Sequence, residues 1–141
     1  MDAGVNYTWV LPAAGAPKGA KKQICAWYTL SVAHIRHENL SDESARHLPH
    51  YPLPVFVLGQ LAVDVRCQGQ GLGDVTLINA LRRCARLSQQ GQVASVAVVV
   101  DVLNDDATQF YRRYSDFKPL DCSDAYDLPR LFIPMQVVRK L

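Results

Sequence analysis

The stretch "LAVDVRCQGQGLGD" (residues 61–74) passes from an apolar, strand-like segment into a glycine-rich turn, and a helical pattern follows at once. Its three glycines stand at every second position, as Gly69, Gly71 and Gly73. Glycine loses more conformational freedom on folding than any other residue, so each of the three carries a cost. One glycine is usually enough for a turn. We therefore expect this backbone to do more than reverse the chain, with a simple tight turn as the alternative interpretation.

The composition of the chain is that of a globular protein. Of its 141 residues, 49% are hydrophobic and 20% charged, which predicts a single domain over residues 1–141. No apolar run reaches ~18 residues, the length of a membrane span, and the amino-terminal sequence has no signal-peptide pattern. These features predict a cytoplasmic protein that does not associate with membranes. The net charge of +2 is too small to indicate nucleic-acid binding by itself.

The four cysteines, Cys25, Cys67, Cys84 and Cys122, are scattered without C-x-x-C spacing. Zinc sites and disulfide frameworks of small secreted proteins show regular cysteine patterns, and this chain has none. The sequence therefore predicts reduced thiols and no metal site.

Hydrophobic periodicity predicts a mixed α/β protein. Apolar and β-branched runs predict strands at residues 6–11, 23–35, 55–65, 93–103, 116–120 and 130–138. Gly59, inside the third strand, indicates a β-bulge or a close backbone approach. Helical periodicity after Gly73 ends near residue 89, and a short helix over residues 104–114 has Asn104 or Asp105 as its N-cap. This order of elements predicts one mixed sheet with helices.

The first of these helices has two different faces. The apolar face, which we expect to be buried, consists of Leu77, Ala80, Leu81, Cys84 and Ala85. The polar face consists of Asn79, Arg82, Arg83, Arg86 and Gln89.

A glycine turn between a strand and a helix presents free N–H groups together with the positive end of the helix dipole. This arrangement is an anion site, most often for phosphate. Two familiar phosphate loops do not fit. A P-loop requires Lys-Ser/Thr after the last glycine, which is absent here, and a Rossmann turn requires G-x-G-x-x-G. The glycine spacing also argues against Asp101 as a ribose ligand.

The spacing Gln68-x-x-Gly71-x-Gly73 resembles the acyl-CoA loop of the GNAT (Gcn5-related N-acetyltransferase) superfamily, [QR]-x-x-G-x-[GA]. A second segment, "NDDATQFY" (residues 104–111), fits the N-x-x-A-x-x-[FLY]-Y pattern that follows in the same proteins. The resemblance covers roughly residues 55–137. It implies a mostly antiparallel sheet whose central strands splay apart, flanked by helices.

The resemblance also implies roles for individual residues. The backbone of Leu61, Ala62 and Val63 would bind the pantetheine arm of acetyl-CoA. The pyrophosphate would bind the amides of Gln68, Gly69, Gln70, Gly71, Leu72, Gly73 and Asp74. Asn104 would contact the cofactor arm, and Tyr111 would protonate the leaving thiolate.

One segment departs from the family pattern. GNAT proteins continue Y-x-x-x-G-F after the catalytic tyrosine, whereas "YRRYSDF" (residues 111–117) has one more residue and Asp116 in place of the glycine. The extra residue implies a local bulge or a longer helix end. Tyr114, one turn further on, is the alternative catalytic tyrosine.

The segments "LGQLAVD" (residues 58–64) and "LFIPM" (residues 131–135) resemble a narrower group, the GNAT toxins of bacterial toxin–antitoxin pairs. This resemblance implies acetylation of the amino group of aminoacyl-tRNA, a block of translation, and a small ribbon-helix-helix antitoxin as partner. Basic residues that could hold tRNA phosphates are Arg36, Arg46, Lys21, Lys22, Arg112 and Arg113, with an ordinary solvated surface as the alternative.

The resemblance implies a strand and two helices ahead of the segment that corresponds to "NYTWVL" (residues 6–11), where the sequence has only residues 1–5. We expect either a short member of the group or a wall supplied by the second subunit of a homodimer. Two alternatives to the toxin function stay open: a GNAT enzyme that acetylates a small amine or a protein N-terminus, and an inactive module that only binds CoA.

Overall fold

The computed structural model describes residues 6–12, 23–40, 46, 48, 52–91, 94–102, 104–114, 116–120 and 130–141. A six-stranded sheet has the order β1-β2-β3-β4-β6-β5. Its strands are β1 (Asn6–Pro12), β2 (Ile24–Ile35), β3 (Leu53–Val63), β4 (Ala97–Asp101), β5 (Lys118–Leu120) and β6 (Arg130–Pro134). The helices are α2 (Leu72–Gln89), α3 (Asp105–Arg112) and α4 (Met135–Val138), with 3₁₀ turns η1 (His37–Asn39) and η2 (Val65–Cys67).

The sheet is mixed and mostly antiparallel, as the sequence predicts. Among the described strands, only β3 and β4 pair in parallel, and α2 connects them. The predicted last strand is too long, since residues 135–138 form α4 instead. Met135 and Val138, three positions apart, both turn into the core, where they are 2% and 1% exposed. A strand would have sent these two side chains to opposite faces of the sheet.

Strand β3 supplies side chains to a hydrophobic cluster on each face of the sheet. Phe56 and Leu58 belong to the cluster beneath α2, with Leu77 and Leu81 of that helix. Val55 and Val57 belong to the cluster on the opposite face. Period-two alternation along one strand therefore anchors both layers of the core.

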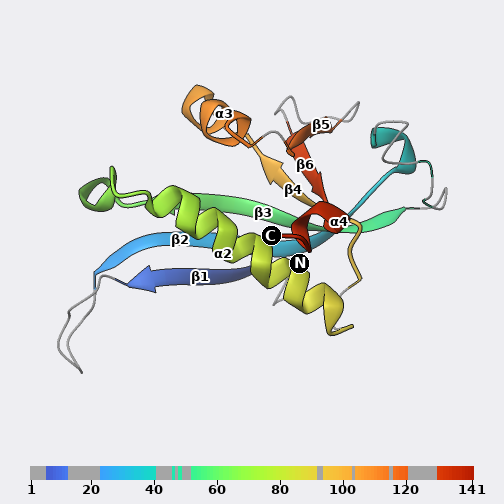
Figure 1. Cartoon of the computed structure of the whole chain (residues 1–141), viewed down its shortest axis with the longest axis horizontal. Coiled ribbons are helices and arrows are strands. Elements are labelled where there is room, and N and C mark those ends of the chain that lie inside the picture. Colours follow the sequence, from blue (N-terminus) through green and yellow to red (C-terminus); the bar gives the residue numbers. More distant parts are fainter. Residues whose placement is uncertain are drawn as a thin grey trace.

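The central strands part halfway along β3. Parallel pairing with β4 covers only Phe56 to Leu58, whereas β3 continues to Val63 while paired with β2 alone. Figure 1 shows β4, β5 and β6 turning away from the β1–β3 side of the sheet. The predicted splay is thus present, and it leaves one edge of residues 59–63 unpaired.

A β-bulge lies where the strands part, as the glycine in this strand indicates. Gly59 and Gln60 together face Thr29 of β2, and the N–H of Gln60 donates to the Thr29 hydroxyl over 3.0 Å. A Cβ at Gly59 would also stand 3.0 Å from that oxygen. Bulges bend a strand and increase its local twist. Gly59 therefore permits both the close approach of Thr29 and the bend.

Two residues on the polar face of α2 bind the sheet. The Tyr28 hydroxyl donates to Asn79 Oδ1 over 2.9 Å and accepts from Arg83 Nε over 2.9 Å. The Arg83 guanidinium also lies 3.5 Å from the centre of the Trp9 ring. Asn79 and Arg83 thus fasten α2 to β1 and β2. Buried Tyr28 requires such partners because an unpaired buried hydroxyl is costly.

The expectation of reduced thiols is wrong for two cysteines. Cys25 at the start of β2 and Cys67 at the end of η2 form a disulfide, with 5.6 Å between their Cα atoms. They are 42 residues apart in sequence, so no local motif indicates the pair. Cys84 is a free thiol, and burial raises its pKa to about 12. The disulfide attaches the start of the glycine turn to β2.

We expect the Cys25–Cys67 bond to stabilise the fold by about 2–4 kcal/mol, since it closes a loop of intermediate length. Thiol titration in denaturant should give two more thiols per chain after reduction than before it. The melting temperature should fall on reduction. The Cys25→Ser/Cys67→Ser double variant should have this lower melting temperature without any reductant, and adding the reductant should not change it. Equal thiol counts in both titrations would contradict the pairing.

Candidate functional site

The three glycines of the turn serve two different needs. Gly69 and Gly71 have φ angles of 82° and 76°, a left-handed conformation that other residues rarely adopt. Gly73 has ordinary dihedrals, but a Cβ there would lie 3.2 Å from the ring of Phe110 in α3. Gly69 and Gly71 therefore shape the turn, and Gly73 lets α2 and α3 approach closely.

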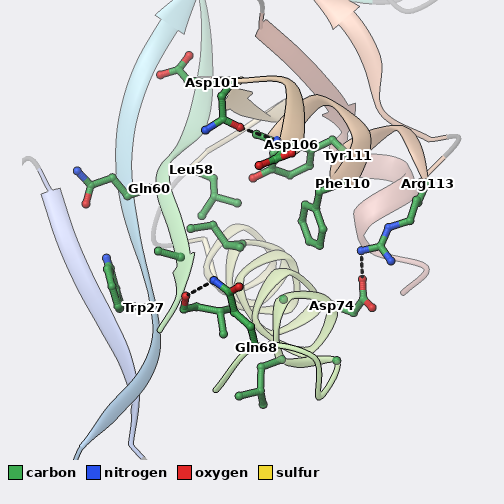
Figure 2. A pocket seen from close by; sticks show the side chains of 18 of the residues that line it. Trp27, Leu58, Gln60, Gln68, Asp74, Asp101, Asp106, Phe110, Tyr111 and Arg113 are labelled. Atoms are coloured by element: carbon green, nitrogen blue, oxygen red, sulfur yellow. Dashed lines mark hydrogen bonds and ion pairs between the residues drawn. The ribbon is translucent and has the colours of Figure 1, made fainter. Parts of the chain in front are cut away.

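A cleft of about 750 Å³ lies between the unpaired edge of β3, the glycine turn and α3 (Figure 2). It collects most of the residues to which the sequence assigns a role in binding or catalysis. These are Leu61, Ala62, Val63, Gln68, Gly69, Gly71, Leu72, Gly73, Asp74, Asn104, Tyr111 and Arg113. Predicted residues that do not line it are Gln70, Arg112, Arg36, Arg46 and the alternative tyrosine Tyr114.

The turn opens onto the cleft at the amino end of α2. Gly71 is the N-cap of this helix and has no side chain to accept from its first N–H groups. Cβ atoms placed at Gly69 or Gly71 would meet nothing within 4 Å among the described residues. The side chain of Gln68 turns back and donates to the Val63 carbonyl over 3.2 Å, which holds the turn against the end of β3. The geometry is that of an anion site at a helix N-terminus.

Tyr111 lies in the wall of the cleft and is 5% exposed. Burial raises the pKa of its phenol to about 12, and the nearby Asp101 carboxylate adds to the rise. Among the described residues, none forms a hydrogen bond with this hydroxyl. Tyr111 thus keeps its proton at neutral pH and has it available for a ligand.

The extra residue after Tyr111 is accommodated in the turns that follow the end of α3. Helix α3 stops at Arg112, and two successive turns follow, from Tyr114 N–H to the Tyr111 carbonyl and from Phe117 N–H to the Tyr114 carbonyl. The second turn returns Phe117 to the Tyr111 ring, with 5.3 Å between ring centres. The insertion therefore leaves Tyr111 in the cleft.

Tyr114, the alternative catalytic residue, has a different partner. Its hydroxyl donates to Asp74 Oδ1 in the first turn of α2, and it does not line the cleft. Desolvation, together with the neighbouring Asp74 carboxylate, raises its pKa to about 12. This contact favours Tyr111 over Tyr114 as the proton donor.

Asn104 caps helix α3 and also lines the cleft. Its Oδ1 accepts from the N–H of Ala107 over 2.8 Å, so it is the N-cap that the sequence predicts. That bond leaves its amide nitrogen for a ligand. Asp101, at the end of β4, also lines the cleft, and its Oδ1 accepts from Arg130 Nε over 2.6 Å.

The four arginines predicted to hold tRNA phosphates do not all line the cleft, and the predicted Lys21 and Lys22 lie outside the described residues. Arg36 follows β2 as the N-cap of η1, Arg46 is exposed, and Arg112 is exposed on α3. Arg113 lies in the cleft, where its guanidinium is 3.2 Å from Asp74 Oδ1 and 5.1 Å from the centre of the Phe110 ring. Of the four, only Arg113 is part of the candidate site.

Some residues that line the cleft were not predicted from the sequence. Trp27 of β2 and Gln60 of the bulge lie on the opposite side from Arg113 (Figure 2). Asp106 comes from the first turn of α3. Trp27 reaches the cleft because it pairs with Ala62 across the β2–β3 ladder, and that register depends on the bulge. A single sequence indicates that a bulge is present but not the register that follows from it.

Within the described ranges, no helix is long and apolar enough to cross a membrane. In the same part of the chain, acidic, histidine and cysteine side chains form no group that could hold a metal ion.

Known proteins with similar sequences and folds include several toxins. A "tRNA-acetylating toxin" of Mycobacterium tuberculosis is 31% identical over 100 residues, which are 70% of this chain and 58% of that protein. The structure of "AtaT complexed with acetyl-methionyl-tRNAfMet" superimposes with a TM-score of 0.79 at 25% identity, over 96% of this chain and 75% of that one. "AtaTR bound with AcCoA" gives 0.74 at 26% identity, over 96% and 74%.

The chain thus spans little more than half the length of its mycobacterial relative. No protein-family model matches it. The similarities in sequence and structure confirm the resemblance to the GNAT toxins and the fold that this resemblance implies.

We expect the raised phenol pKa values to make the fold sensitive to alkali. The pKa of Tyr111 is higher in the folded state than in the unfolded chain. Its contribution to the free energy of unfolding is therefore complete below pH 10 and is lost as the pH rises toward 12. The difference between the two pKa values corresponds to about 2–3 kcal/mol of stability. Thermal melts between pH 9 and 12 should show a shallower decline for Tyr111→Phe than for the wild type. Parallel declines would contradict the assigned burial.

Proposed function

We propose that this chain is an acetyl-CoA-dependent N-acetyltransferase, the toxin of a toxin–antitoxin pair, which acetylates the amino group of aminoacyl-tRNA and so blocks translation. The observation that carries the proposal is one cleft that joins an unpaired strand edge, an anion-binding turn and a buried, protonated tyrosine. The names of the relatives support the same activity.

The cleft suits the three parts of an acyl-CoA. The unpaired edge of residues 59–63 offers backbone groups to an extended amide-containing arm, as a neighbouring strand would. The amides from Gln68 to Asp74, at the amino end of α2, suit a pyrophosphate. Asn104 has an amide nitrogen available beside the arm. When bound, acetyl-CoA supplies a thioester as the activated acyl group.

The chemistry requires a proton at the leaving sulfur. The neutral nitrogen of the acceptor attacks the thioester carbonyl carbon, an N–C bond forms, the C–S bond breaks and its electron pair passes to sulfur. Tyr111 donates its phenolic proton to that sulfur, the acceptor nitrogen loses a proton to water after its attack, and the Tyr111 phenolate takes a proton back from water. A phenol with a pKa of about 12 is fully protonated before the step, as a general acid must be.

The proposed acceptor and antitoxin are of the kinds that the similar toxins bind. Aminoacyl-tRNA is a cytoplasmic substrate, so the proposed location is the cytoplasm. The exposed Arg36, Arg46 and Arg112 are candidates for contacts with tRNA phosphates. A related structure is the AtaT Y144F mutant toxin bound to the C-terminus of the antitoxin AtaR and acetyl-CoA. A ribbon-helix-helix antitoxin and a homodimer complete the proposal.

The acceptor is tested with labelled acetyl-CoA and charged tRNA. We expect label on the amino acid of the tRNA, and inhibition of in vitro translation only when acetyl-CoA is present. The Gly71→Glu variant should abolish both effects, together with the rise in melting temperature on adding acetyl-CoA, because its side chain blocks and repels the pyrophosphate.

Other outcomes of this test separate the alternatives. Label on a polyamine or a peptide N-terminus, with none on charged tRNA, would replace the toxin function by another acetyltransferase. A rise in melting temperature without transfer to any amine would indicate an inactive CoA-binding module.

We expect Tyr111→Phe to lower turnover by ~10²-fold or more, because it removes the proton and keeps the ring. Acetyl-CoA affinity, measured by calorimetry, should stay within about twofold of the wild type. Tyr114→Phe is the matched control and should leave most of the turnover intact. The reverse pattern would make Tyr114 the proton donor.

A further inference from the structure

We infer that Arg113 binds the phosphates of the acyl-CoA, and that Asp74 and Tyr114 hold it ready at the mouth of the glycine turn. This inference rests on the proposed function and gives Arg113 a different role from the tRNA contact that the sequence favours.

The charges that line the cleft make Arg113 necessary for an anionic ligand. Among the described lining residues there are three carboxylates, Asp74, Asp101 and Asp106, and one cationic side chain, that of Arg113. Asp101 is paired with Arg130. Without Arg113, a pyrophosphate at the turn would face the Asp74 carboxylate with only backbone amides to balance the repulsion.

Packing directs the guanidinium of Arg113 toward the turn. It lies over Phe110, 5.1 Å from the ring centre, and the same ring is the group that a Cβ at Gly73 would meet at 3.2 Å. Its Nη2 is 3.2 Å from Asp74 Oδ1 (Figure 2). Arg113 therefore stands next to the first turn of α2, where the free amides are.

The contacts of Asp74 allow Arg113 to change partner. Tyr114 donates to the same carboxylate oxygen, so Asp74 keeps a hydrogen bond when the guanidinium leaves. The Arg113 side chain is 61% exposed and free to reorient. A guanidinium forms paired hydrogen bonds with phosphate oxygens more strongly than with a solvated carboxylate of a surface ion pair. Arg113 thus passes from Asp74 to phosphate when the ligand binds, while Tyr114 keeps Asp74 in place.

The test compares ligands with and without phosphates. Calorimetry should give Arg113→Gln about 10- to 100-fold weaker binding of acetyl-CoA, the usual loss for a charge-assisted hydrogen bond. Binding of S-acetylpantetheine, which has no phosphate, should not change. The affinity for acetyl-CoA should also fall less steeply with salt in this variant than in the wild type.

Three further variants define the role. Arg82→Gln removes an exposed charge of α2 outside the cleft and should bind acetyl-CoA like the wild type. Arg113→Lys should recover part of the loss, since a point charge remains. Asp74→Asn added to Arg113→Gln should also recover part, because it removes the repulsion. Circular dichroism melts check that each variant folds.

The outcomes distinguish this inference from the proposed function. If the wild type binds no acetyl-CoA, the proposed function fails. If the wild type binds it and Arg113→Gln binds it equally well, only the role of Arg113 is wrong. Equal losses for acetyl-CoA and S-acetylpantetheine would mean that Arg113 supports the shape of the cleft, which also overturns the inference.

Discussion

The bend of β3 at Gly59 is the constraint on which the site depends. A Cβ at position 59 would stand 3.0 Å from the Thr29 hydroxyl, and the pairing of β3 with β4 ends at Leu58, next to the bulge. The two halves of β3 therefore have different roles. Its first half ties both hydrophobic clusters together, and its second half offers a free backbone edge to the cleft. Substituting a β-branched residue at Gly59 would disturb both.

The two walls of the cleft are joined by contacts between α2 and α3. Gly73 brings the glycine turn against Phe110, and Asp74 binds Tyr114 in the turn that follows α3. On the other side, the Cys25–Cys67 bond fixes the start of the turn to β2. The anion site is therefore set by three elements that are far apart in the sequence. Its shape depends on the packing of the whole fold and not on the turn alone.

The sequence predicts what depends on local backbone requirements. The glycine turn, the Asn104 cap, the bulge at Gly59 and the long strand β2 each follow from residues that favour one local conformation. What it misses depends on contacts between distant segments. The pairing of Arg83 with Tyr28 spans 55 positions, and Trp27 reaches the cleft only through the register of two strands. Neither of these contacts produces a periodic pattern or a local motif in the sequence.

The free edge of β3 also bears on aggregation. An open strand edge is a template on which another chain can add a strand, and natural proteins usually blunt or cover such edges. Here the five residues from Gly59 to Val63 lie inside a cleft bordered by α3 and the glycine turn. A ligand that lies along this edge would cover its unpaired backbone groups and so remove the template while it is bound.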